Sequence, residues 1–182
     1  MRLRLFLSLI CLFLVPLLPA FAVQDPAALH VNDTPAADAA DLIRRSEIVA
    51  AGRIESRVQE FPTGRSVSTG KVVNYIQRFH VQKTLKGPGM RQISVLSRGI
   101  EPLPDRFSPL NMTYPGPLAE GIYLLFLQRV KGTDLYSITG FWQGVYPILN
   151  ERTIALRGSG FPELHGLTLS GVERELKRIG HR

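Results

Sequence analysis

A period-two alternation of apolar and polar residues limits what this chain can fold into more than any other feature. Residues 47–58, "EIVAAGRIESRV", place small and apolar residues on one side and charged residues on the other. Residues 73–85 repeat the pattern, and "KGPG" ends it because Pro88 and two glycines cannot continue a strand ladder. Successive side chains of a strand point to opposite faces, so both stretches are predicted as half-exposed antiparallel strands.

Glycine and proline residues within and between these strands predict where the chain bends. Gly52 lies inside the first strand, where a glycine is typical of a bend or a bulge. Residues 60–70, "EFPTGRSVSTG", are polar and contain Gly and Pro, so they are predicted as a loop. Residues 100–120 form a long Pro-rich connection.

The remaining elements are short. Residues 121–130, "GIYLLFLQRV", are almost continuously apolar, which predicts a central strand covered on both faces. Further strands are predicted at 91–99, 135–140, 141–149 and 152–158, and helices at 38–47 and 167–180, where Ser170 and Glu173 have capping-box spacing. Short strands separated by Gly and Pro turns predict a mainly β fold, either a small barrel or a sandwich.

The N-terminal residues 1–22 are predicted to be a signal peptide. Two arginines precede an apolar run, and Ala20-Phe21-Ala22 fits the small-x-small pattern of a cleavage site. The run is also close to the length of a membrane anchor, but two prolines near its end favour cleavage after Ala22. Cleavage predicts export to the periplasm or the medium, with no membrane span in the mature chain.

Cleavage would also change the chemistry of the chain. The single cysteine, Cys11, would leave with the signal, which excludes disulfides and cysteine metal sites from the mature protein. The formal charge would fall from +7 to +5, because two of the 22 basic residues also leave. The basic residues are scattered, which is typical of a solvated surface; attraction to an acidic envelope surface or polymer is the alternative.

Four segments together carry a family resemblance: "SEIVAAGRI", "FHVQKTLKG", "EGIYLLFL" and "FWQGVYPI". Their order resembles a family of exported bacterial proteins of uncertain role, and is similar to the OB-type barrel of tissue inhibitors of metalloproteinases and netrin-like modules. The resemblance covers residues 38–150 and implies a small antiparallel OB-like β-barrel with a short N-terminal helix and a C-terminal helix. Those inhibitors chelate the protease zinc through an N-terminal cysteine, which the predicted mature chain lacks, so their mechanism does not carry over.

This fold divides the chain into four parts. Residues 1–22 are the signal peptide, 23–37 a flexible leader, 38–160 the β-barrel domain and 161–182 a C-terminal helical tail.

An aromatic cluster gives the candidate binding surface. It comprises the aromatic residues Tyr114, Phe141, Trp142 and Tyr146 and the polar residue Gln143, around the "GFWQG" segment and the long loop 100–119. Aromatic rings beside polar groups provide large contact area at low entropy cost. The alternative is that Phe141 and Trp142 cap the hydrophobic core. Binding of single-stranded nucleic acid is not expected, because export removes that partner and the aromatics are not interleaved with basic residues.

Catalytic and metal patterns are weak. The four histidines, His30, His80, His165 and His181, have no metal-ligand spacing, and Ser159 in "RGSGF" lacks the context of a nucleophile elbow. Neither a metal nor a cofactor is predicted. The leading hypothesis is a non-catalytic binding or interaction module for a protein or an envelope polymer. The alternatives are an envelope-acting hydrolase using the loop carboxylates of Glu101, Asp105 and Glu120, and a purely structural role.

Overall fold

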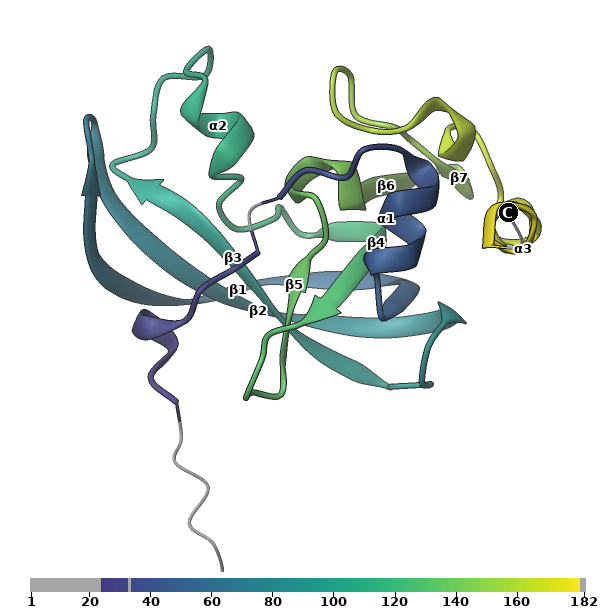
Figure 1. Cartoon of the computed structure of the whole chain (residues 1–182), viewed down its shortest axis with the longest axis horizontal. Coiled ribbons are helices and arrows are strands. Elements are labelled where there is room, and N and C mark those ends of the chain that lie inside the picture. Colours follow the sequence, from purple (N-terminus) through teal and green to yellow (C-terminus); the bar gives the residue numbers. More distant parts are fainter. Residues whose placement is uncertain (1–23, 33, 181–182) are drawn as a thin grey trace, which may run out of the picture.

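The computed structural model describes residues 24–32 and 34–180 (Figure 1). The predicted signal peptide lies outside the described residues. The elements, in chain order, are η1 (Pro26–Ala28), α1 (Ala39–Arg45), β1 (Ile48–Val67), β2 (Gly70–Lys86), β3 (Gln92–Glu101), α2 (Leu110–Thr113), β4 (Gly121–Arg129), β5 (Leu135–Ile138), η2 (Phe141–Gly144), β6 (Val145–Leu149), β7 (Arg152–Thr153), η3 (Pro162–Leu164) and α3 (Leu169–Gly180).

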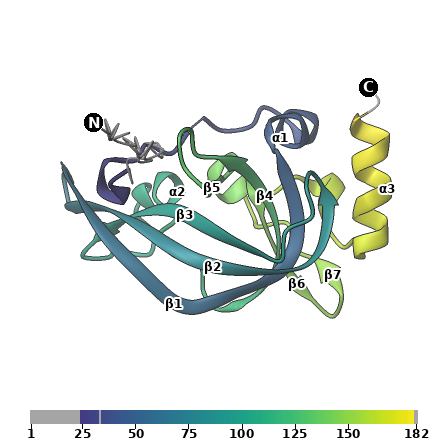
Figure 2. The ribbon, with the colours of Figure 1, turned by 90° about the horizontal axis from the view of Figure 1, so that it is seen from below.

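The protein is mainly β, as the alternation predicts. Within the described residues, seven strands are hydrogen-bonded in the order β1-β2-β3-β5-β4-β6-β7, and a further ladder joins β1 to β4. The β3–β5 ladder is parallel, whereas the other ladders are antiparallel. Strands β1 and β2 are long and strongly curved (Figure 2), and this curvature lets β1 contact β2 along its length and β4 near its beginning.

Two features of β1 explain its shape. The register against β2 shifts between Ala51 and Gly52, which confirms the irregularity predicted at Gly52. The loop predicted at residues 60–70 is wrong, because β1 continues to Val67 and pairs with β2 almost to the turn. This part of β1 pairs only with β2, and an edge strand tolerates a residue such as Pro62 because one side of its backbone needs no ladder partner.

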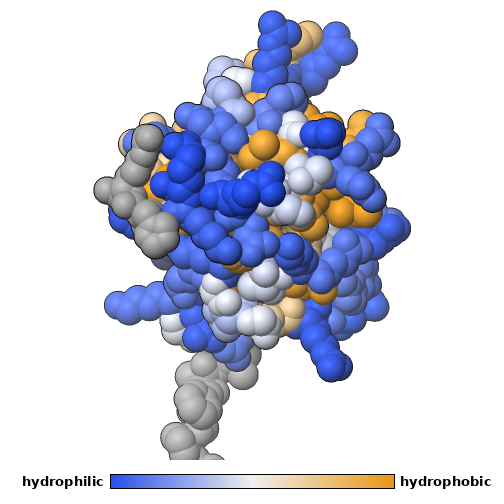
Figure 3. Space-filling model, turned by 90° about the vertical axis from the view of Figure 1, so that its right-hand side faces the viewer, coloured by the Kyte–Doolittle hydropathy of each residue, from blue (hydrophilic) through white to orange (hydrophobic). Residues whose placement is uncertain are grey.

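The core occupies both faces of β1 and β4. On one face, Val49 of β1 and Phe126 of β4 pack with α1 and α3; on the other, Ile48 and Leu125 pack with residues of β2, β3 and β5. Strand β4 is therefore buried on both faces, as its continuous apolar run predicts. On the side that carries α3, the surface is mainly hydrophilic, and apolar surface is confined to smaller areas (Figure 3).

The two longer helices are fixed by local signals. Asp38 caps α1, since its carboxylate accepts from the Asp41 N–H at 2.7 Å. The cap predicted at Ser170 is wrong: α3 begins earlier, and the hydroxyl of Thr168 accepts from the Gly171 N–H at 3.2 Å. In the described part of the chain, no helix combines the length and apolar character that crossing a membrane requires.

Candidate functional site

A cavity of about 210 Å³ lies beside the aromatic segment; it is called the Trp142 cavity below. Its walls come from four parts of the chain: the segment before α1, the end of α2, the η2 turn and the turn before η3. The lining residues are Pro35, Met112, Thr113, Gly140, Phe141, Trp142, Gln143, Gly158 and Ser159. The predicted combination of the long loop with "GFWQG" is therefore brought together in space.

The η2 turn replaces the first part of the strand predicted at 141–149, because β6 begins only at Val145. Gly140 and Phe141 have φ values of 67° and 57°, in the left-handed region that a strand cannot contain. Gly144 closes the turn, since a Cβ there would meet the Thr139 carbonyl oxygen at 2.4 Å. The left-handed backbone of Phe141 costs about 1–2 kcal/mol, and such strain is often found at functional sites.

Trp142 links the cavity to the long loop. Its indole Nε1–H donates to the Asn111 carbonyl oxygen at 2.7 Å. Asn111 in turn donates from its side-chain amide to the Asp105 carbonyl oxygen at 2.8 Å. The ring is half-buried, so one part packs against the core while another lines the cavity. Trp142 thus anchors α2 and the preceding loop to the body of the protein.

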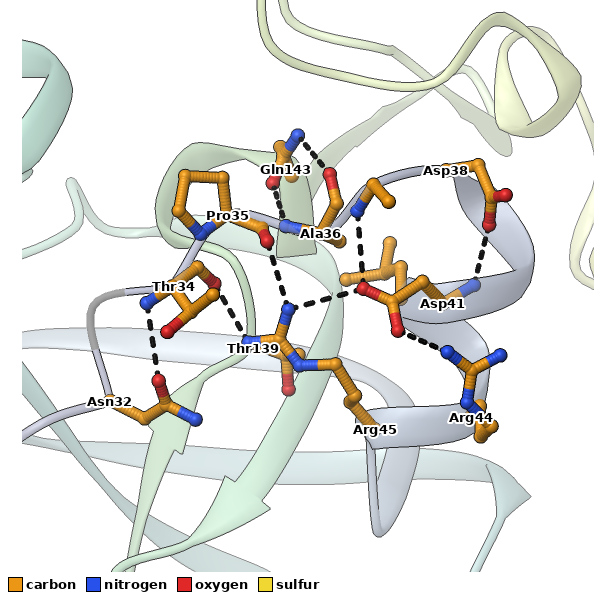
Figure 4. A network of polar contacts seen from close by, with 12 residues as sticks. Asn32, Thr34, Pro35, Ala36, Asp38, Asp41, Arg44, Arg45, Thr139 and Gln143 are labelled. Atoms are coloured by element: carbon orange, nitrogen blue, oxygen red, sulfur yellow. Dashed lines mark hydrogen bonds and ion pairs between the residues drawn. The ribbon is translucent and has the colours of Figure 1, made fainter.

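Gln143 holds the segment before α1. Its side-chain oxygen accepts from the Ala36 N–H at 2.6 Å, and its amide donates to the Ala36 carbonyl oxygen at 3.0 Å. Arg45 adds hydrogen bonds to the carbonyl oxygens of Thr34, at 2.7 Å, and Pro35, at 3.0 Å. Figure 4 shows these groups converging on one short stretch of backbone. Together these hydrogen bonds place Pro35 in the cavity wall. The amide oxygen and nitrogen of Gln143 both bind the Ala36 backbone.

Part of the segment predicted as a flexible leader, residues 23–37, contacts the body of the protein, although most of its described residues are exposed. Leu29 is buried against Leu96 and Val130, and the Asn74 amide donates to two carbonyl oxygens of the segment. Composition rich in Ala, Pro and Asp predicts a flexible segment. Side chains from distant strands override that tendency here by satisfying the backbone.

Acid is expected to loosen this segment. The Ala37 N–H, followed by Arg45 and Arg44, holds the pKa of Asp41 below its usual value of 3.8, although burial opposes this. Because the folded pKa is lowered, the stabilisation is complete above pH 3.8 and is lost as the pH falls through the folded pKa. The protection of the amides in residues 34–37, measured against the intrinsic exchange rate at each pH, should fall in that acid range. Asp41→Asn should already exchange fast at neutral pH and lose the acid dependence; equal protection in both proteins would contradict this role.

Tyr114 lies next to the cavity rather than in its wall. The Arg98 guanidinium lies over its ring, 5.8 Å from the centroid. Arg98 is only 4% exposed, and burial lowers its pKa from the usual value. Phe141 lines the Trp142 cavity on one side and a smaller cleft that includes Arg98 on the other. Tyr114 thus packs behind the wall of the Trp142 cavity and does not line it.

Tyr146 lies away from the surface. It is fully buried, its ring meets that of Phe126 edge-on at 5.7 Å, and its hydroxyl accepts from the Phe161 N–H at 3.0 Å. Of the five predicted residues, Phe141, Trp142 and Gln143 line the cavity, Tyr114 adjoins it and Tyr146 is part of the core.

Sequence reasoning missed several members of the site. Pro35, Met112 and Gly158 lie far apart in the sequence, and no local pattern joins them. The sequence does carry a signal for a second group of residues. Leu103, Phe107 and Met112 are large apolar residues in a Pro-rich loop, and no strand pattern in that loop predicts that they are buried. They are 81%, 78% and 52% exposed.

The loop carboxylates considered for hydrolysis each have a structural partner. Glu101 accepts from the Tyr75 hydroxyl at 2.7 Å, Asp105 accepts from the Phe107 N–H at 2.9 Å, and Glu120 pairs with Arg53. Among the residues that the structure describes, no three His, Cys, Asp or Glu side chains are grouped as metal ligands would be.

No protein-family model, curated protein or solved structure matches this chain significantly.

Proposed function

We propose that this protein is an exported, non-catalytic binding module and that the Trp142 cavity is its ligand site. The observation that carries the proposal is the convergence of four separate segments on one cavity whose wall contains two aromatic rings and a strained backbone. Binding sites are typically concave and mostly apolar, with a few polar groups that orient the ligand. Here Thr113 and Ser159, which line the cavity, are proposed to supply those polar groups.

The proposed scaffold is an OB-like β-barrel. Its support is the sequence of ladders β1–β2–β3–β5–β4, which returns to β1 through the β1–β4 pairing. A five-stranded Greek-key barrel is the arrangement of the OB fold. The resemblance to tissue inhibitors of metalloproteinases and netrin-like modules points to the same scaffold, and the predicted signal peptide places it in the periplasm or the medium.

The cavity suits an apolar side chain presented by a partner protein. Its volume of about 210 Å³ is small, below the roughly 300–1,000 Å³ of pockets that enclose a whole small molecule. Most of its lining is aromatic, Met, Pro or Gly, and the Gln143 amide is already engaged by Ala36. We therefore expect an anchoring residue of a protein partner to enter it, surrounded by contacts from α2.

Filling the cavity should abolish binding while leaving the fold intact. Ser159 lines the cavity and is half-exposed, so Ser159→Phe places a ring in the cavity without entering the core. Trp142 is the single tryptophan of the chain, so labelling the protein with 5-fluorotryptophan gives one fluorine signal, and added proteins do not contribute to it. Addition of fractionated envelope proteins should shift this fluorine resonance in the wild type and leave that of Ser159→Phe unchanged.

A matched control distinguishes the effect of filling the Trp142 cavity from the effect of adding a phenyl ring elsewhere on the protein. Ser68→Phe makes the same change at an exposed position in the β1–β2 turn, and it should respond as the wild type does. Photo-crosslinking from position 113 then identifies the bound protein. A shift of the fluorine resonance that survives Ser159→Phe, or crosslinks that are identical in the two variants, would contradict a ligand site in this cavity.

A further inference from the structure

We propose that residues 102–109, the apolar loop, insert into the surface of a lipid bilayer. Leu103 and Phe107 in this loop are the two most exposed large hydrophobic side chains of the described chain, at 81% and 78%. Neither of them lines the Trp142 cavity. This proposal goes beyond the binding module and rests on different residues from those that would hold its ligand.

The apolar loop is held in a defined shape. Asp105 organises its turn: the side chain accepts from the Phe107 N–H at 2.9 Å, and the carbonyl oxygen accepts from the Ser108 N–H and the Asn111 amide, both at 2.8 Å. Trp142 then anchors Asn111 to the body of the protein. Three prolines restrict the backbone further. Phe107 is thus presented to solvent by an ordered turn, and insertion would require little additional ordering.

The shape of this region favours a bilayer over a folded partner. The loop and α2 project beyond the strands in Figure 1, and Leu103 and Phe107 of this loop are largely exposed. A projecting apolar tip needs a soft partner or a matching cavity in order to leave water, and a bilayer interface accepts such a tip without a preformed cavity. Phe is among the residues that enter the interface readily as part of such a tip.

The charges around the loop fit a surface with anionic headgroups. The Arg106 guanidinium lies 4.5 Å from the centroid of the Phe107 ring, where it would remain at headgroup level while the ring inserts. Lys71, on the neighbouring hairpin, pairs in register with Glu101 at the base of the loop, and Arg65 is also exposed on that hairpin. Glu101 and Asp105 keep their negative charges, and Tyr75 and the loop backbone hold them by hydrogen bonds. The exposed Arg106, Lys71 and Arg65 are therefore the groups free to turn towards anionic headgroups.

Vesicle co-sedimentation tests the proposal on the protein in the form in which cells export it, with its N-terminus read by mass spectrometry. Every variant shares that N-terminus, so its contribution is equal in all of them. The vesicles are phosphatidylcholine alone, or with about 30% phosphatidylglycerol as the anionic lipid. We expect the wild type to sediment with both and more strongly with the anionic mixture. The double variant Leu103→Ser/Phe107→Ser should bind at least about tenfold more weakly, because it loses most of the apolar area.

Two further variants make the result specific. Leu149→Ser removes an equally large side chain that is 62% exposed on the β6–β7 hairpin, and it should bind as the wild type does. Phe107→Trp, made with Trp142 kept in place because it anchors the loop, should show a blue-shifted emission component on vesicle addition that brominated lipid quenches and that the wild type, whose emission comes from Trp142 alone, does not show. Wild-type protein that stays in the supernatant with both vesicles, or a double variant that binds equally well, would overturn the proposal. So would a Phe107-dependent crosslink to an envelope protein without vesicle binding, because the loop would then be a protein contact.

Discussion

Replacing Tyr146 with Ala is expected to lower the free energy of unfolding by about 3–5 kcal/mol, as for other large aromatic truncations in cores. Tyr146 is 0% exposed, and it packs between Phe126 and the residues that hold α1 and α3. Truncation would leave a cavity on the face of the sheet that the helices cover. It would also leave the Phe161 N–H without its acceptor. Urea unfolding followed by circular dichroism measures the loss.

Two variants calibrate that result. Tyr146→Phe keeps the ring and removes only the hydroxyl, so it should cost about 1–3 kcal/mol, the penalty for a buried donor left unsatisfied. Leu149→Ala truncates a residue that is 62% exposed and should change the stability by less than about 0.5 kcal/mol. If Tyr146→Ala unfolded at the same urea concentration as Leu149→Ala, the core assignment of Tyr146 would be wrong. The large expected loss also means that binding defects of Tyr146 variants cannot report on a surface site.

Gly52→Ala is expected to destabilise the protein by about 1–3 kcal/mol, or more if the strands cannot separate. A Cβ at position 52 would lie 2.1 Å from the His80 carbonyl oxygen and 3.0 Å from the Val81 Cα. Both are backbone atoms, so β1 and β2 would have to move apart at the point where their register shifts. Because β1 also pairs with β4 at this residue, the displacement would strain two ladders at once.

Gly89→Ala is the matched control for that variant. A Cβ at position 89 would meet nothing within 4 Å, and the residue lies in the turn after β2. It should leave the midpoint of thermal unfolding unchanged or slightly raised, because alanine restricts the unfolded chain more than glycine does. Equal midpoints for the two variants would show that the close approach of β1 to β2 at Gly52 is not required.

The sequence predicted the parts of this fold that depend on local periodicity. Alternation located β1 and β2, and the continuous apolar run located β4. The extension of β1 past Pro62 could not be predicted, because it depends on pairing with β2 across a turn. The η2 turn was also missed, because its left-handed residues include Phe141, which has no local preference for that conformation.

For the candidate site, aromatic composition pointed to Trp142 and Phe141, and the structure places both in the cavity wall. The same reasoning also selected Tyr146, because residue type alone does not distinguish a core ring from a surface ring. The alternation of apolar and polar residues shows which side chains are buried only when a strand is covered on one face. Both faces of β6 are packed around Tyr146 and Val145. The role of Gln143 depends on Ala36, which lies 107 residues earlier in the chain.

The separation of 107 residues between Ala36 and Gln143 affects the order in which contacts form while the chain is synthesised. A chain leaves the ribosome, or a translocation channel, from its N-terminus, so Ala36 emerges long before Gln143. Until Gln143 itself has emerged, the segment before α1 has no Gln143 amide to hold its backbone. The backbone of Ala36 is thus among the last parts of the N-terminal segment to reach its native contacts, whereas Pro26 and Leu29 meet Asn74 much earlier in synthesis.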